Sequence, residues 1–275
     1  MPQRPEVKGC LRCLLAPLTR LLVLLLVAVL ALQLYFVARI ALMTVVAPES
    51  TAFERSEIYR VARTSGALKW RQQWVPYERI SVNLQRAVIA SEDASFTEHD
   101  GLDLEALEKA WEKNAVAEAR AKKVADQLAA QAARHGKKAS ALAATPKPAA
   151  KAAKIIGGST ITQQLAKNLF LSGERTLLRK GEELVLTLLL ESMLSKQRIL
   201  EIYLNSVEWG EGVFGAEAAS QHYFRKPASR LSPYEAARLA VMLPRPRYFE
   251  TRPNSDYLAT RANVIVARMG GVDVP

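Results

Sequence analysis

The pattern of hydrophobic and polar residues divides the chain into one long apolar segment near the N-terminus and a longer body with helical periodicity. Residues 21–38 contain a single strongly polar side chain, Gln33, and apolar character resumes after Arg39 until Pro48. At about 1.5 Å per residue, residues 21–46 are long enough to cross the core of a bilayer. A signal peptide has a shorter apolar core followed directly by its cleavage site, so we expect an uncleaved transmembrane anchor.

The charges before the anchor predict its direction. Four basic residues precede the apolar segment: Arg4, Lys8, Arg12 and Arg20. Positively charged flanks stay on the cytoplasmic side of a membrane. Residues 1–20 are therefore expected to form a cytoplasmic tail, and the chain after Pro48 to lie outside. Nucleoside triphosphates are absent there, so a polymerising enzyme would need a pre-activated, lipid-linked substrate.

Helical signals predominate in the remaining body, residues 50–275. We expect helices over residues 83–91, 104–111, 160–168, 177–194, 197–204, 215–222, 233–242 and 256–269. The apolar run at residues 184–190 is too short to span a bilayer and indicates a core helix. Because strand-like alternation is rare, the fold class is expected to be mainly α.

Residues 114–154 differ in composition from the chain around them, since they are mostly Ala, Lys, Arg and Gln and lack aromatic residues. Alanine favours helix, so the first half is a candidate for a solvated helix. The second half, which contains Pro146 and Pro148, is typical of a flexible basic linker. We interpret the segment as an insertion without catalytic residues, either a solvated tether or a segment attracted to anionic lipid or polymer.

The formal net charge of +11 belongs mainly to the insertion and the N-terminal region. Residues 113–154 hold ten Lys and Arg against two Asp and Glu, and residues 1–39 hold five against one. The remaining chain is close to neutral, which argues against nucleic-acid binding, because that function needs a basic face on a folded domain. The only cysteines, Cys10 and Cys13, lack a second pair of ligands, which argues against a zinc site.

Residues 157–171 (GGSTITQQLAKNLFL) concentrate polar groups at the start of a predicted helix. Ser159 or Thr160 would cap the helix after two glycines, and a helix N-terminus suits a phosphate. Polar side chains then lie along the helix: Thr160, Gln163, Gln164, Lys167 and Asn168. Such a row is costly to bury, and it suits a sugar diphosphate. The alternative is an ordinary capped amphipathic helix.

This segment resembles the signature of family 51 glycosyltransferases, which include monofunctional transglycosylases and the glycosyltransferase half of bifunctional penicillin-binding proteins. Further blocks agree in order: EDASFTEHDGLD at residues 92–103, RKGEE at 179–183, KQRILEIYLN at 196–205, and GVFGAEAA at 212–219 with EAARL at 235–239. The resemblance covers residues 85–267, and NSVEWG at residues 205–210 is similar to the monofunctional branch. It implies a lysozyme-like, two-lobed glycosyltransferase domain, and the insertion is longer than the family leads us to expect.

The resemblance also implies roles for individual residues. Glu92 matches the family's catalytic glutamate and would be the general base on the acceptor 4-hydroxyl. Asp93 beside it is expected to orient or cap. Glu183 matches the second active-site carboxylate, with a structural ion pair as the alternative. His99 is expected to be a structural hydrogen-bonding residue.

Cations that match the family's donor site would stabilise a leaving diphosphate. Lys167 offers a point charge and Arg175 a bidentate contact to phosphate, with Arg179 and Lys180 in support. No metal-ligand spacing is evident, so no metal site and no required cofactor are expected, although the family allows stimulation by Mg²⁺ or Mn²⁺.

The implied function is polymerisation of lipid II into glycan strands by an inverting peptidoglycan glycosyltransferase. It would act periplasmically, at the outer face of the bacterial inner membrane, and release undecaprenyl diphosphate. The sequence lacks Ser-x-x-Lys and Lys-Thr-Gly motifs, so no transpeptidase activity is expected. Expected partners are lipid II, the nascent strand, membrane lipid and proteins of cell-wall synthesis or division, with no nucleic acid.

Two other functions are compatible with parts of this pattern. A lytic, muramidase-like hydrolase would need a carboxylic acid but no diphosphate site, and Lys167 and Arg175 argue against it. A non-enzymatic scaffold of the division machinery would have no activity to lose when Glu92 is changed to Gln.

Overall fold

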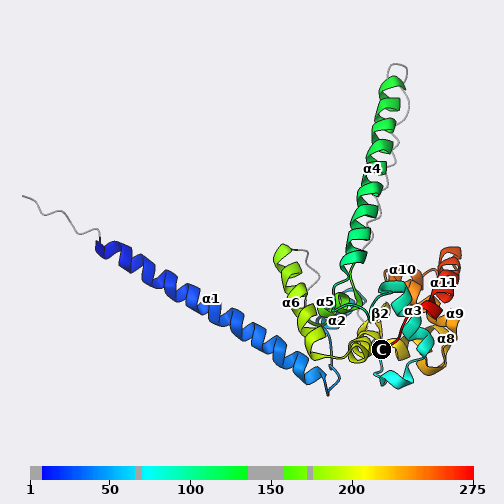
Figure 1. The fold of residues 1–275 in the computed structure, drawn as a ribbon, viewed down its shortest axis with the longest axis horizontal. Helices are drawn as coiled ribbons and strands as arrows, with labels where there is room; N and C mark the ends of the chain where they lie inside the picture. Colours follow the sequence, from blue (N-terminus) through cyan, green and yellow to red (C-terminus); the bar gives the residue numbers. More distant parts are fainter. Residues whose placement is uncertain (1–7, 66–69, 136–157, 172–175) are drawn as a thin grey trace, which may run out of the picture.

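The computed structural model describes residues 8–65, 70–135, 158–171 and 176–275 (Figure 1). A single long helix, α1 (Lys8–Met43), extends away from a body of packed helices, and α4 (Leu104–His135) projects from that body in another direction. The described chain is mainly α, as predicted, with three short strands.

Helix α1 contains the predicted apolar segment. Its stretch Pro17–Met43 is long and apolar enough to cross a membrane, with a mean hydropathy of 2.8. The helix starts before residue 21 and ends at Met43, three residues before the predicted end of the anchor. Its last turns belong to the protein core, because Phe36, Ile40 and Met43 are buried against the body.

Two contacts fix the end of α1 to the body. The Phe36 ring packs edge-on against Phe170, with ring centroids 5.3 Å apart. The Arg198 Nε donates a hydrogen bond of 2.8 Å to the Met43 carbonyl, which would otherwise be an unpaired group at the helix C-terminus. The end of α1 and the body are therefore packed together rather than joined by a free linker.

The other helices of the described chain are α2 (Ala52–Ser65), α3 (Val82–Glu92), α5 (Ile161–Phe170), α6 (Leu177–Met193), α7 (Lys196–Ser206), α8 (Ala216–Phe224), α9 (Pro233–Met242), α10 (Pro246–Glu250) and α11 (Asp256–Arg268). Apart from α2 and α10, they largely follow the predicted ranges. Short 3-10 turns are η1 (Tyr77–Arg79), η2 (Ala228–Arg230) and η3 (Met269–Gly271). The sequence analysis missed α2 and α10.

Helix α4 includes the first half of the Ala/Lys-rich insertion. It continues without a break from Leu104 to His135, where the sequence predicted separate structure after residue 111. The expectation of a solvated helix in the first half of the insertion is confirmed, because α4 continues to His135 and most of the side chains described beyond Trp111 are exposed. The predicted linker in the second half falls mainly on residues outside the described chain.

The body packs as two groups of helices, in agreement with the implied two-lobed arrangement. Helices α3, α9 and α11 pack on one another in one group, and α5 packs on α2, α6 and α7 in the other. A small sheet of order β1-β3-β2 joins distant segments: β1 (Arg71–Gln72) pairs parallel to β3 (Val213–Phe214), and β2 (Glu208–Gly210) pairs antiparallel to it.

The end of α7 is held by Asn205, whose side chain is fully buried. Its Oδ1 accepts a bond of 2.9 Å from Val75 N, and its Nδ2 donates to Val75 O at 3.0 Å. Gly215 lies against the same residue with a φ of +81°, and a Cβ there would be 2.6 Å from the Asn205 carbonyl oxygen. Only glycine fits this turn without strain, and the turn sets where α8 begins.

Candidate active site

Glu92 ends helix α3 and reaches toward helix α5. Ser81 caps the start of α3, its Oγ accepting a bond from Asn83 N, and the apolar face of α3 is buried through Leu84 and Val88. The Glu92 carboxylate is partly buried, and its Oε2 accepts a hydrogen bond of 3.0 Å from Gln164 Nε2.

Burial raises the pKa of Glu92. Bonds from Gln164 and Ser91 oppose this rise, and the charge of Asp93 adds to it. Desolvation favours the neutral carboxylic acid, so the carboxylate has a strengthened tendency to take up a proton. This is the property that a general base needs.

Tyr203 fixes the orientation of Gln164. Its hydroxyl donates a bond of 3.0 Å to Gln164 Oε1, which leaves Nε2 to face Glu92. Tyr203 is fully buried, and burial raises its pKa well above the ordinary value, with the charges of Glu92 and Asp93 adding to the effect. The hydroxyl therefore keeps its proton and remains a donor.

Sequence reasoning missed Tyr203 as part of the site. It lies on α7, 39 residues after Gln164, and from its pattern it is one apolar residue among several that face the core. Only the packing of α7 on α5 shows that its hydroxyl points to the site.

Asp93 and His99 tie the end of α3 to the start of α5. Asp93 Oδ2 accepts a bond of 2.9 Å from Ile161 N, the first helical residue of α5, and its Oδ1 lies 2.9 Å from His99 Nε2. His99 Nδ1 accepts from Gly101 N at 3.1 Å. These bonds confirm that Asp93 has an orienting or capping role and that His99 is a structural hydrogen-bonding residue.

Thr160 and Gln163 form a capping box at the start of α5. Gln163 N donates to Thr160 Oγ1 at 3.2 Å, and Thr160 N donates to Gln163 Oε1 at 3.1 Å. The Thr160 hydroxyl also donates to the Gly101 carbonyl at 2.7 Å. These side chains build the helix start, and their predicted contact with substrate stays a prediction. Ser159 beside them is exposed.

Two cavities flank Glu92 and Gln164. The cavity beside Glu92 measures about 340 Å³, and Asp93, Ser159, Thr160, Lys109, Lys113 and Arg268 are among its lining residues. A second cavity of about 360 Å³ contains four of the predicted substrate-binding residues, namely Gln164, Lys167, Asn168 and Arg179. Because Gln164 lines the second cavity and bonds Glu92 of the first, the carboxylate lies at the border between them.

Glu183 forms ion pairs with Arg179, which lines the second cavity, and with Lys180. It is buried, its Oε2 accepts a bond of 3.2 Å from Arg179 Nη1, and its Oε1 pairs with Lys180 Nζ. Arg179 Nε is buried without a hydrogen-bond partner among the described groups. Glu183 thus forms an ion pair that positions Arg179, and whether it has a further role stays a prediction. Arg175 lies outside the described residues.

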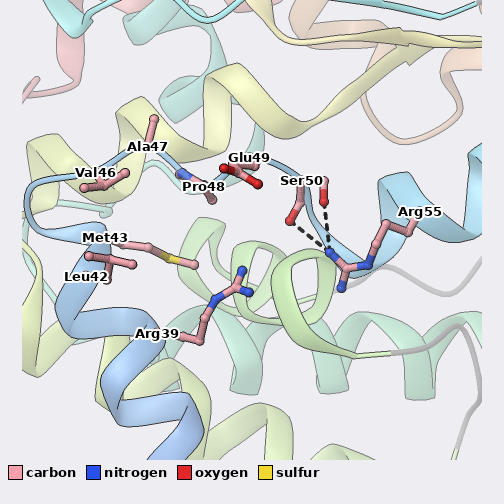
Figure 2. Close-up of a pocket in the computed structure, with 9 residues that line it drawn as sticks. All are labelled: Arg39, Leu42, Met43, Val46, Ala47, Pro48, Glu49, Ser50 and Arg55. Atoms are coloured by element: carbon pink, nitrogen blue, oxygen red, sulfur yellow. Dashed lines mark hydrogen bonds between the residues drawn. The ribbon is translucent and has the colours of Figure 1, made fainter.

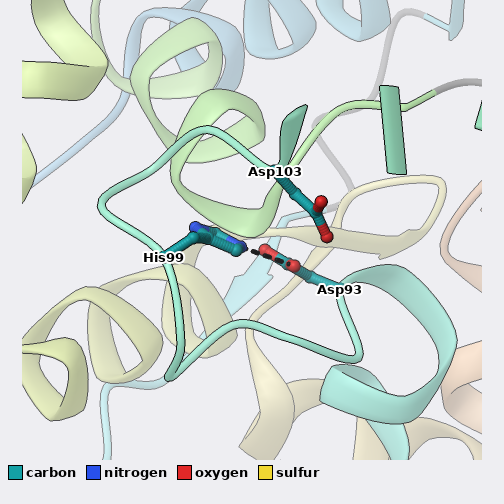
Figure 3. Close-up of side chains that lie close together, drawn as sticks. All are labelled: Asp93, His99 and Asp103. Atoms are coloured by element: carbon teal, nitrogen blue, oxygen red, sulfur yellow. Dashed lines mark hydrogen bonds and ion pairs between the residues drawn. The ribbon is translucent and has the colours of Figure 1, made fainter. Parts of the chain in front are cut away.

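Asp93, His99 and Asp103 are close enough to share a metal ion (Figure 3). One ligand atom from each lies within 4.8 Å of the others, a grouping that their sequence spacing did not indicate. Their atoms already serve the protein, since Asp103 also accepts bonds from Ala106 N at 2.7 Å and from Ser95 Oγ. We interpret the group as a hydrogen-bonded cluster that stabilises the loop between α3 and α4.

A desolvated carboxylate beside a cavity lined by Lys167 and Arg179 is typical of an enzyme that uses acid–base chemistry. Comparison with known proteins is specific: the transglycosylase family model matches residues 60–141 and 135–270. Similar relatives include the biosynthetic peptidoglycan transglycosylases of Burkholderia thailandensis, Burkholderia orbicola and Burkholderia pseudomallei, at 50%, 49% and 48% identity. The matches cover 90% of this chain and 83%, 86% and 83% of those relatives.

The chain belongs to the transglycosylase family. It is a peptidoglycan glycosyltransferase with an N-terminal helix suited to membrane anchoring. The family resemblance and the class of enzyme inferred from the sequence are confirmed.

Proposed function

We propose that the enzyme polymerises lipid II into glycan strands at the outer face of the inner membrane. The growing strand is the donor, lipid II is the acceptor, and undecaprenyl diphosphate is released. The observation that carries this proposal is the position of Glu92, a desolvated carboxylate held by Gln164 at the border between two cavities, one of which is lined by Lys167 and Arg179.

In the proposed reaction Glu92 takes the proton of the acceptor sugar's 4-hydroxyl. The hydroxyl oxygen forms a bond to the anomeric carbon of the donor, while the bond from that carbon to the diphosphate oxygen breaks. The diphosphate leaves with the electron pair, and the anomeric configuration inverts in this single displacement. The raised pKa of Glu92 supports proton transfer from a weakly acidic alcohol.

The second cavity is suited to the departing diphosphate. Lys167 and Arg179 line it and would stabilise the negative charge that develops as the bond breaks. Arg175 and Lys180 complete the proposed cation set. The cavity beside Glu92, which Ser159 lines, would hold sugar residues of the substrates.

The setting of the reaction follows from the anchor. The basic residues before the apolar segment that begins at residue 21 favour a cytoplasmic N-terminus and a periplasmic body. There, membrane lipid, lipid II and other cell-wall or division proteins are the proposed partners. The enzyme would lack transpeptidase activity. It would need no cofactor. Stimulation of polymerisation by Mg²⁺ or Mn²⁺ is tested by removing divalent ions from the protein with a chelator and then adding each ion back.

A polymerisation assay separates this function from its rivals. Purified full-length protein in detergent, given labelled lipid II, should yield long glycan, and Glu92→Gln should yield none. Glu105→Gln is the matched control, because Glu105 is an exposed carboxylate on α4. Soluble fragments released from preformed peptidoglycan would indicate a hydrolase instead, and no product in either assay would indicate a scaffold.

A further inference from the structure

A third cavity, of about 300 Å³, lies where the anchor meets the body (Figure 2). It shares no lining residue with the two cavities of the active site. Its lining comes from the last turns of α1, from the connecting residues 46–50 and from Arg55 on α2. The stretch of α1 that could cross a membrane ends here, at Met43, so the cavity would open at the bilayer surface.

Two arginines bring positive charge to this cavity. Arg39 donates from Nη1 to the Tyr35 hydroxyl at 3.3 Å, and Arg55 donates from Nη1 to the carbonyl and hydroxyl oxygens of Ser50, both at 3.1 Å. Neither guanidinium forms an ion pair with a carboxylate in the part of the chain that the structure describes. Glu49 is the acidic residue of the lining, so positive charge exceeds negative charge there.

The same cavity has an apolar wall. Leu42 and Val46 line it and are 55% and 48% exposed, although both are apolar. Exposed apolar groups beside guanidinium groups that have no carboxylate partner match an amphiphile with an anionic head. Its hydrocarbon would cover the apolar groups, and its anion would neutralise the guanidinium charges. Figure 2 shows Arg39 approaching from α1 and Arg55 from α2.

We propose that this cavity binds a membrane phospholipid, with the headgroup phosphate between Arg39 and Arg55 and acyl carbon against Leu42 and Val46. The inference rests on the membrane anchoring in the proposed function. A lipid phosphate and the diphosphate of a polyprenyl carrier share this chemistry, and we assign the site to the phospholipid because it is separate from the catalytic cavities.

The site has a structural connection to the donor cavity. Arg55 lies two residues after Phe53, which lines the second cavity, and both are on α2, which packs on the Lys167-bearing helix α5. A phosphate bound between Arg39 and Arg55 would join α1 to α2. It would thereby fix the distance of the active site from the membrane surface.

Native mass spectrometry of the full-length protein in detergent, with dioleoylphosphatidylglycerol added, tests the proposal. The protein should retain one phospholipid, and the double variant Arg39→Gln/Arg55→Gln should lower its occupancy about tenfold or more, since it removes both charges that would neutralise the phosphate. The control is Arg63→Gln/Arg252→Gln, which removes two guanidinium groups that stack on tyrosine rings elsewhere.

Further binding measurements identify the ligand and separate its binding from catalysis. Dioleoylglycerol, which lacks the phosphate, should not bind the unaltered protein, and equal binding of both lipids would overturn the proposal even if the double variant failed to fold. Unchanged occupancy in a folded double variant would also overturn it. Displacement of the phospholipid by millimolar inorganic phosphate, or by an equal amount of undecaprenyl diphosphate, would reassign the site. All arms are repeated in Glu92→Gln, where polymerisation is not required.

Discussion

The hydrogen-bonded chain from Tyr203 through Gln164 to Glu92 predicts how the base should respond when its support is removed. Gln164→Leu removes the donor that stabilises the ionised Glu92 carboxylate, and this donor opposes the effect of burial on the Glu92 pKa. Its loss raises the pKa of Glu92 further. Because the base must be ionised to accept a proton, the acidic limb of the pH–rate profile should move to higher pH.

The magnitude follows from the strength of such bonds. A hydrogen bond to a charged group contributes about 1.5–3 kcal/mol, and a tenfold change corresponds to about 1.4 kcal/mol. Gln164→Leu should therefore lower the rate about 10- to 100-fold on the acidic limb. Tyr203→Phe removes a neutral bond of about 0.5–1.5 kcal/mol and leaves the Gln164 amide free to rotate, so it should lower the rate about 2- to 10-fold.

The assay is the initial rate of glycan formation from lipid II across a pH series, with both single variants and the double variant. Since Tyr203 acts through Gln164, the double variant should be no slower than Gln164→Leu alone. Tyr223→Phe is the control, because this partly buried hydroxyl donates to the Trp209 carbonyl and not to the site. A loss of rate that is equal at every pH, or additive effects of the two variants, would refute the reasoning.

Three further predictions concern stability and the donor site. Glu92→Gln should raise the melting temperature by a few degrees near neutral pH. The pKa of Glu92 is raised in the folded protein, so the ionised carboxylate lowers the stability of the wild type as pH rises. In acid Glu92 is neutral, so the gain in melting temperature of the variant should vanish there, and an equal gain in acid would contradict this. Gly215→Ala should destabilise by about 1–3 kcal/mol in urea unfolding, because of its positive φ and the clash with Asn205; unchanged stability would refute the strain. Lys167→Ala should slow polymerisation about tenfold or more, and an unchanged rate would remove Lys167 from the donor site.

The helices were predictable from the sequence where their ends carry local signals. Helix α9 matches its predicted range at both ends, because Ser232 caps it, Pro233 begins it and Glu235 completes a capping box. Helix α10 has only five residues and α2 is polar over most of its length, so neither presents a clear apolar period. Strands of two or three residues are too short to show alternation.

The site was predictable in its residue types but not in its connections. Glu92 and Gln164 were identified separately, and their contact depends on Asp93 joining α3 to the first residue of α5 across the insertion. The contribution of Tyr203 depends on how α7 packs against α5, which no local pattern records. Likewise, the buried end of α1 looked like part of a uniform anchor, because Phe36 and Ile40 are as apolar as their exposed neighbours on the helix.

The central claim is that Glu92 activates an acceptor hydroxyl for displacement of a lipid diphosphate. The most direct measurement counts both products in one reaction, disaccharide units joined and undecaprenyl diphosphate released, for the wild-type protein, Glu92→Gln and Glu105→Gln. The account predicts one diphosphate released for each unit joined by the wild type and the Glu105 variant, and neither product from Glu92→Gln. Glycan formation by Glu92→Gln at the wild-type rate would contradict it.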